Sequence, residues 1–294
     1  MKPPIFLTKV RTAAGKQPAR LLIESLRHFG GDLSESPFWL FAPPPQAASM
    51  QDLTDLGVRI VALDVPEQML HYPLADKVYA CARAEELAPP GVQSLIWMDL
   101  SCLVVNPPEL YDLGGTRDAA LRPVHIRNVG LPAAGPLDAY WKKIYETLGI
   151  ADIEITVESF VDKQSIRAYY NTHAFAINPA KGLLRSWLAY FDRLLCDQDF
   201  QAGPCQDELH QVFLHQAVFS ALLASTLAPE RVRMLPPAYN YPYNLHSELP
   251  LERQAQALND LVTLTYEDRS LNPADVRDIE IREPLRSWLA GHAK

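Results

Sequence analysis

The sequence predicts an α/β protein with a mixed, mostly parallel central sheet flanked by helices. Strand-like and helix-like segments alternate through the first third of the chain, the pattern of parallel strands joined by helical crossovers. Residues 95–98 form a run that is apolar on both faces, which fits a strand inside such a sheet. Asp99 follows this run directly, at the edge where open α/β sheets bind ligands. We therefore expect Asp99 at the carboxyl end of a buried strand, beside a cleft.

Glycine and proline mark the ends of the elements in this first third. Gly30 and Gly57 each follow an apolar segment with helical spacing, and glycine commonly ends a helix. The second strand stops at three consecutive prolines, residues 43–45. We expect strands at residues 5–10, 38–41, 58–63 and 95–98, and helices at 21–29, 50–56 and 74–87.

The rest of the chain is less regular. Residues 137–148 form an amphipathic helix, and the helix at 208–227 is apolar enough to be buried on much of its surface. We expect the remaining elements as strands at 119–124, 169–179, 233–237 and 261–266, and as helices at 182–195 and 284–292. Since no repeat or linker is visible, we expect a single domain over residues 1–294, with 250–294 as a C-terminal extension packed on it.

Composition excludes several classes of protein. The 294 residues, 48% hydrophobic and 21% charged, are ordinary for a globular protein, and the net charge of −8 argues against a nucleic-acid surface. No segment approaches the roughly 20 apolar residues of a membrane span. The apolar stretch after Met1 and Lys2 is too short for a signal peptide. The four cysteines lack disulfide-like or metal-like spacing, so we expect a reducing, cytoplasmic location.

Several short motifs follow one another in a fixed order. They are Thr8 at the end of the first strand, Ala75-Asp76-Lys77, Asp99-Leu100-Ser101, Tyr170-Asn171-Thr172, His215-Gln216 and Tyr239-Asn240-Tyr241. This order, over residues 5–266, resembles the GT-A-type glycosyltransferases, nearest to the family 8-like retaining enzymes. Its most specific part is residues 97–110, a strand end, an acidic motif, an apolar run, two prolines and Glu-Leu.

The resemblance implies a GT-A-like fold, a bacterial-type transferase, and a nucleotide-diphosphate sugar, such as a UDP-sugar, as the donor. The acceptor would be a glycan, a lipid or a protein. In such enzymes the departing diphosphate needs its charge met by a metal or by fixed cations. No protein nucleophile is expected.

The acidic motif departs from the family's DxD pattern at Ser101, which stands where the resembling enzymes have a second acid. There the two acids hold a divalent metal at the phosphates, and Mg²⁺ or Mn²⁺ prefers charged oxygen ligands. Asp99 would therefore hold a metal weakly unless substrate phosphates complete its shell, in which case metal and nucleotide would bind with positive coupling. A late histidine often joins the metal in the family, and His246 is the candidate here. The resemblance makes Asp99 a catalytic residue, a cofactor-binding residue with Ser101, and the main metal ligand.

The same resemblance gives roles to five further residues. Lys77 would reach the diphosphate, and Thr8 and His215 would line the cofactor site. Asn171 and Gln216 would be catalytic residues facing the sugar, because an amide both donates and accepts hydrogen bonds. Three of them have an alternative interpretation: a surface Lys77 paired with a neighbouring acid, an Asn171 that caps a turn, and a His215 hydrogen-bonded in the core.

Two other functions stay open. A protein that kept this fold and lost transfer would bind a ligand or a partner protein, and the replacement of family acids by Ser101 and His215 favours this alternative. A nucleotidyltransferase would carry a basic, glycine-rich loop after the first strand, which residues 11–16 resemble only faintly. The tyrosines within residues 239–243 could line an acceptor groove or pack in the core.

Overall fold

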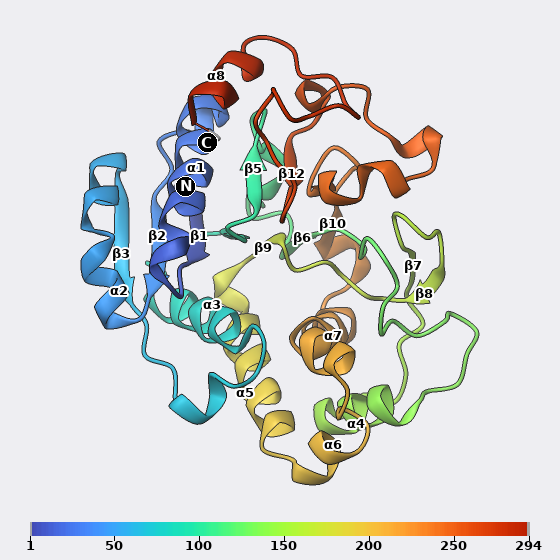
Figure 1. Ribbon diagram of the computed structural model, residues 1–294. Coiled ribbons are helices and arrows are strands. Elements are labelled where there is room, and N and C mark those ends of the chain that lie inside the picture. Colours follow the sequence, from blue (N-terminus) through green and yellow to red (C-terminus); the bar gives the residue numbers. More distant parts are fainter. Residues whose placement is uncertain (1, 293–294) are drawn as a thin grey trace.

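A seven-stranded central sheet forms the middle of the molecule in the computed structural model, which describes residues 2–292 (Figure 1). The strand order is β10-β6-β9-β4-β1-β2-β3. The bounds are β1 Ile5–Lys9, β2 Phe38–Ala42, β3 Val58–Ala62, β4 Leu95–Met98, β6 Ala119–Leu121, β9 Ala174–Ile177 and β10 Val232–Met234. Neighbours pair in parallel except that β9 runs antiparallel to β4 and β6. The predicted mixed, mostly parallel α/β sheet is confirmed.

Helices cover both faces of this sheet, which explains why its central strands are apolar throughout. Figure 1 shows α3, α5 and α7 on one side and α1 and α8 on the other. In β1, Leu7 belongs to the core under α3 and α5, and Phe6 to the core under α1. The helices are α1 Lys16–Phe29, α2 Pro44–Ser49, α3 Ala75–Leu87, α4 Ala139–Leu148, α5 Leu183–Leu195, α6 Gln198–Ala202, α7 Glu208–Thr226 and α8 Leu285–His292.

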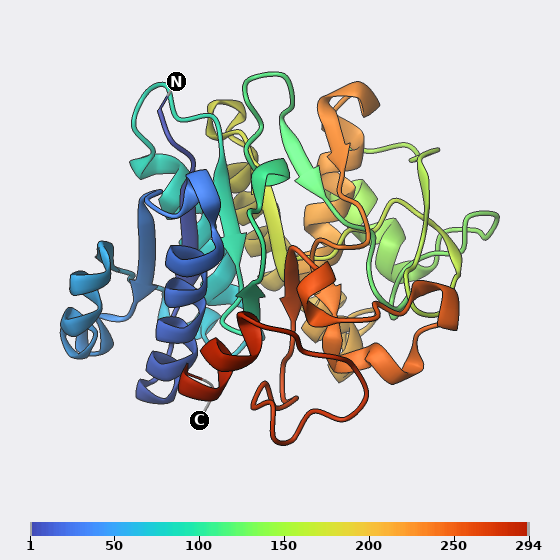
Figure 2. The ribbon, with the colours of Figure 1, turned by 90° about the horizontal axis from the view of Figure 1, so that it is seen from above.

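The late part of the chain packs against the early part through a second, three-stranded sheet. It contains β5 Cys102–Val104, β11 Tyr241–Pro242 and β12 Thr263–Thr265, in the order β11-β12-β5. Figure 2 shows α8 beside α1, where the ring centroids of Trp288 and Phe29 lie 5.2 Å apart. The strands β7 Thr156–Glu158 and β8 Ser165–Arg167 form a separate hairpin. That residues 250–294 are an extension of a single domain stays a prediction, and residues 1, 293 and 294 lie outside the described residues.

Three of the predicted elements differ most from those observed. The apolar run around Asp99 divides into β4 and β5, which belong to different sheets. The strand expected at 169–179 begins only at Ala174, because the polar residues before it form a turn-like segment. The helix expected at 50–56 is a 3₁₀ helix, and α2 begins at Pro44, where a stop was expected. Proline suits the first turn of a helix because the N–H it lacks would have no partner there.

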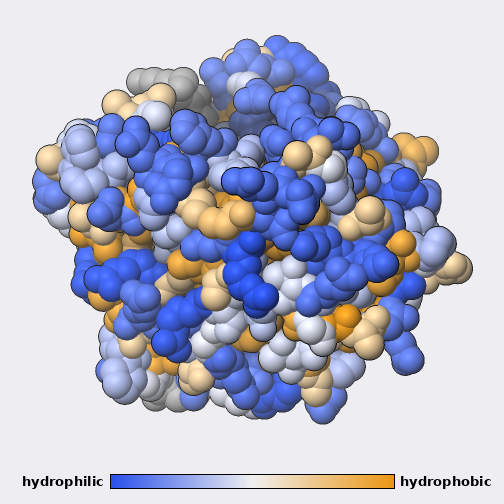
Figure 3. Space-filling view, turned by 90° about the horizontal axis from the view of Figure 1, so that it is seen from below, coloured by the Kyte–Doolittle hydropathy of each residue, from blue (hydrophilic) through white to orange (hydrophobic). Residues whose placement is uncertain are grey.

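The surface seen from the side of α3, α5 and α7 is mainly hydrophilic, with scattered apolar areas (Figure 3). Within residues 2–292, none of the helices combines the length and the apolarity that crossing a membrane requires.

Candidate functional site

The candidate site lies where the strand order of the central sheet reverses. From β1 the chain continues outward to β2 and β3, and β4 then returns to the opposite side of β1. Open α/β sheets bind ligands at such a point, beyond the carboxyl ends of the strands. A cavity of about 400 Å³ opens there, with Lys9 ending β1, Arg11 just after it, and Asp99 and Ser101 following β4. The predicted position of Asp99, at a strand end beside a cavity, is confirmed.

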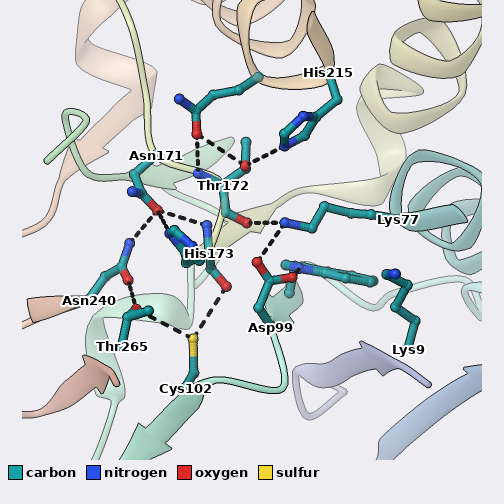
Figure 4. Close-up of polar contacts among 12 residues, drawn as sticks. Lys9, Lys77, Asp99, Cys102, Asn171, Thr172, His173, His215, Asn240 and Thr265 are labelled. Atoms are coloured by element: carbon teal, nitrogen blue, oxygen red, sulfur yellow. Dashed lines mark hydrogen bonds and ion pairs between the residues drawn. The ribbon is translucent and has the colours of Figure 1, made fainter. Parts of the chain in front are cut away.

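Asp99 forms an ion pair with Lys77 at the wall of this cavity (Figure 4). The distance from Lys77 Nζ to Asp99 Oδ2 is 2.7 Å, and Trp97 Nε1 donates to the other carboxylate oxygen at 2.8 Å. Burial raises the pKa of Asp99, but the Lys77 ammonium and these hydrogen bonds outweigh it, so that the pKa lies below its ordinary value. Both oxygens of the Asp99 carboxylate are thus engaged within the protein.

One interpretation of the sequence placed Lys77 on the surface, but the residue is buried. Only 1% of the residue is exposed, and its ammonium also donates to the Thr172 carbonyl at 3.1 Å. Lys77 is the third residue of α3, and its ammonium is received by Asp99 rather than by the adjacent Asp76. Asp76 pairs instead with Lys9, at 2.6 Å. Contact between Lys77 and a diphosphate stays a prediction.

Three residues expected to contact the donor, Asn171, His215 and Gln216, have side chains that point into the protein. His215 and Gln216, both on α7, contact Thr172: its hydroxyl lies 3.0 Å from His215 Nε2, and its N–H donates to Gln216 Oε1 at 3.2 Å. Asn171 Oδ1 accepts from the His173 N–H and from Asn240 Nδ2, at 2.7 and 2.8 Å. Asn171, His215 and Gln216 are each at most 4% exposed, and none lines the cavity.

His215 is held as a neutral ring. Burial is the main cause that lowers its pKa, to about 3, with a further contribution from the Lys77 ammonium. Its Nδ1 lies 2.9 Å from the Val212 carbonyl, which can only accept, so Nδ1 carries the proton. Nε2 is then an acceptor, and it shares the single proton of the Thr172 hydroxyl with Gln216 Oε1, which lies 3.2 Å from the same oxygen. This geometry agrees with the alternative of a hydrogen-bonded core histidine.

Two cavity residues, His173 and Glu267, were missed by the sequence analysis. His173 Nε2 lies 3.2 Å from Glu267 Oε1, and His173 Nδ1 lies 3.1 Å from Asn171 Oδ1. The hydrogen bond with His173 is the largest cause that lowers the pKa of Glu267. His173 directly follows the Asn171-Thr172 motif, and Glu267 directly follows the strand expected at 261–266. This adjacency was the signal in the sequence that could have identified them.

Lys9 and Arg11 were also missed as site residues, although Arg11 belongs to the basic stretch 11–16. Arg11 Nη2 donates to the Leu70 carbonyl at 2.9 Å, and Lys9 is bound by Asp76. Both side chains also line a second cavity beside the first. The signal for them was their position at the carboxyl end of the first strand.

The remaining candidates lie away from the cavity lining. Thr8 is fully buried in β1, and its hydroxyl has no hydrogen-bond partner within the described part of the chain. His246 is 3% exposed, and its Nδ1 lies 2.6 Å from the Tyr241 hydroxyl. Tyr241 and Tyr243 are 1% exposed and belong to the core beneath α8, so packing is the correct interpretation for this group.

The divalent metal that the family resemblance implies would need charged oxygen ligands from the residues around this cavity. Each Asp99 oxygen already accepts a hydrogen bond, one of them from the Lys77 ammonium that neutralises the carboxylate, and Ser101 offers only a neutral hydroxyl. Glu267 is bound by His173 and by Asn244 Nδ2, the latter at 2.8 Å. Across residues 2–292 there is no group of three or more His, Cys, Asp or Glu side chains arranged to hold a metal ion. The donor set does not fit the ligand preference of Mg²⁺ or Mn²⁺.

Solved glycosyltransferase structures share this fold. The galactosyltransferase LgtC, solved with donor and acceptor sugar analogs, aligns with a TM-score of 0.55 and 15% identity over 99% of this chain and 96% of its own. Mouse xyloside xylosyltransferase 1 aligns with a TM-score of 0.50 and 13% identity, over 94% of this chain and 100% of its own. The glycosyltransferase GlyE of Streptococcus pneumoniae TIGR4 aligns with a TM-score of 0.50 and 12% identity, over 100% of this chain and 60% of its own. The predicted GT-A-like fold is confirmed.

Sequence comparison gives the family. No curated protein sequence matches the chain. The family model described as Rhodobacterales glycosyltransferase domain matches residues 13–222, which contain most of the central sheet, most of α7 and the Asp99 turn. The chain therefore belongs to the Rhodobacterales glycosyltransferase domain family.

Proposed function

We propose that the cavity beside Asp99 binds the diphosphate of a nucleotide-diphosphate sugar, and that the protein transfers the glycosyl group to a glycan, lipid or protein acceptor. The observation that carries this proposal is the position of two cations, Lys9 and Arg11, at the reversal point of the sheet. A diphosphate leaving group gains negative charge as it departs, and fixed cations stabilise that charge. The family match and the sugar analogs named for the LgtC structure support the same reaction class.

The second cavity suits the nucleoside part of this donor. It measures about 320 Å³, lies beyond β1, β2 and β3, and shares Lys9 and Arg11 with the first cavity. Phe41 and Leu63 give it an apolar wall, and Asp64 adds a carboxylate that can accept hydrogen bonds from a base. A nucleoside there would place its diphosphate beside Arg11 and its sugar near Asp99. UDP is our first candidate for the nucleotide.

The candidate residues that stand around the Asp99 turn divide into two groups. Asp99 and Ser101 line the cavity and would touch the donor directly, whereas Asn171, His215 and Gln216 would position the turn that carries His173. The inward direction of these three side chains favours one alternative, a protein that binds the donor without transferring its sugar. A reducing, cytoplasmic location is also proposed, supported by four cysteines that are all unpaired.

Titration calorimetry with UDP, GDP and their glucose and galactose conjugates tests the donor site. Arg11→Met should weaken UDP binding about 5- to 150-fold, the equivalent of ~1–3 kcal/mol for a charge-assisted contact. Arg282→Met is the matched control, because Arg282 is partly exposed and lines neither cavity, and it should leave UDP binding unchanged.

Two outcomes would contradict the proposal. If no nucleotide or nucleotide sugar binds, or if Arg11→Met binds UDP as tightly as the natural protein, the cavity is not the donor site. Release of UDP from the bound UDP-sugar, followed over time, distinguishes the two candidate functions: a transferase should hydrolyse its donor slowly without acceptor, and a binding-only protein should not.

A further inference from the structure

We infer that this site binds its nucleotide diphosphate without a divalent metal, because the buried ammonium of Lys77 already serves as the counter-cation of Asp99. The inference rests on the proposed donor site and specifies how its charge is balanced. It departs from the metal that the family resemblance implies.

The first step concerns the Asp99 carboxylate. A metal ion would need at least one of its oxygens, and these accept from Lys77 Nζ at 2.7 Å and from Trp97 Nε1 at 2.8 Å. The ammonium cannot move aside easily, since its side chain is 2% exposed and it also donates to the Thr172 carbonyl. Displacing it would leave a cation buried without a partner, which is strongly unfavourable.

The second step concerns charge. A divalent ion on the outer side of Asp99 would stand close to the Lys77 ammonium in a partly buried place, where repulsion between like charges is weakly screened. The Lys77–Asp99 pair is neutral, as are two carboxylates that bind one divalent ion. The protein thus reaches the charge balance of a metal-loaded acidic pair with its own side chains.

The third step concerns the other oxygen ligands around the cavity. Ser101 is neutral, and the Glu267 carboxylate is bound by His173 and Asn244. The Thr265 hydroxyl, in the neighbouring strand β12, donates to Asn240 Oδ1 at 2.8 Å (Figure 4). A cation at Asp99 would therefore find little besides water and the substrate. The phosphates would instead meet Arg11 and, beside it, Lys9, which is also paired with Asp76.

Calorimetric titration of UDP in EDTA and in MnCl₂ tests the inference on the natural protein. We expect the two dissociation constants to agree within threefold. A gain of threefold or more with Mn²⁺ would overturn the inference while leaving the donor site intact. If UDP binds under neither condition, the proposed function fails. Direct Mn²⁺ titration by electron paramagnetic resonance then decides whether Asp99 holds a metal. Micromolar Mn²⁺ binding that Asp99→Asn abolishes would refute the metal-free site, and the absence of such binding would support it.

Substitution of Lys77 gives a gain of function to look for. Lys77→Met frees a carboxylate oxygen, so UDP binding should become at least threefold tighter with Mn²⁺ than in EDTA. Lys77→Arg keeps the cation and should stay indifferent to Mn²⁺. A folded Lys77→Met protein as indifferent to Mn²⁺ as the natural protein would contradict the role given to Lys77. If Lys77→Met does not fold, as circular dichroism would reveal, the titrations of the natural protein and of Lys77→Arg decide the question.

Discussion

Replacement of Lys77 by methionine should destabilise the protein far more than the same replacement of an exposed helical lysine. The Lys77 side chain is 2% exposed and bound to Asp99, whereas that of Lys142 on α4 is 66% exposed and lies 4.0 Å from Glu146. Methionine keeps most of the side-chain volume, so the comparison reports mainly on charge and hydrogen bonding. The change leaves Asp99 without its cation and the Thr172 carbonyl without its donor.

The expected loss for Lys77→Met is about 3–4 kcal/mol in the free energy of unfolding. Breaking a buried ion pair from one side costs roughly 3–5 kcal/mol. We take the lower end because the Asp99 side chain is 18% exposed and keeps its bond from Trp97, and the lost Thr172 contact adds about 1 kcal/mol. Lys142→Met should cost less than about 0.5 kcal/mol, as is usual for exposed pairs.

The loss of stability in Lys77→Met should also depend on pH. In the natural protein the folded pKa of Asp99 is lowered, so Asp99 stabilises the fold above the unfolded value and loses this contribution as pH falls. Without Lys77, burial becomes the main influence and raises the folded pKa. The carboxylate then destabilises the fold at pH 7, and the deficit shrinks as pH falls through that raised pKa.

Chemical denaturation followed by circular dichroism, at pH 7 and pH 4.5, measures these effects. Lys77→Met, Asp99→Asn and the double variant form a cycle in which the coupling energy should be about 2 kcal/mol. A Lys77→Met protein that loses no more stability than Lys142→Met, with the same deficit at both pH values, would refute the buried ion pair.

Two further predictions concern a buried histidine and a glycine pair. The pKa of His215 is about 3 in the folded protein, so below pH ~6.5 the unfolded chain binds a proton at this residue and the folded chain does not. The free energy of unfolding should therefore fall by up to about 1.4 kcal/mol per pH unit as pH falls below ~6.5. His215→Gln should remove that share of the slope in denaturation between pH 6.5 and 4; an unchanged slope would show that His215 titrates normally. Gly31 and Gly57 both have positive φ, +56° and +71°, so alanine at either should cost about 1–2 kcal/mol. Gly31→Ala should cost about 1–3 kcal/mol more, since its Cβ would lie 2.8 Å from Pro107 Cγ, whereas the nearest atom at Gly57 is 3.6 Å away; equal melting temperatures for the two variants would contradict this.

The sheet and the position of Asp99 followed from local features of the sequence. Strand and helix periodicities, and the glycines and prolines that end them, act within a few residues, so the expected strands at 5–10, 38–41, 58–63 and 95–98 match β1 to β4 closely. An acid directly after a buried strand must lie at the edge of the sheet. The motif order was enough to predict the GT-A-like fold.

The contacts within the site depended on the tertiary structure. Lys77 and Asp99 are 22 residues apart, and His173 and Glu267 are 94 apart, so their pairing requires knowing which strand ends meet. The direction of His215 was equally hidden, because α7 is apolar around much of its circumference and its sequence marks no single inward face. The sequence alone therefore determined which residue types stand at the strand ends. Only packing decided that Lys77 turns inward to neutralise Asp99, because a buried carboxylate is stable only beside a cation that the folded chain brings to it.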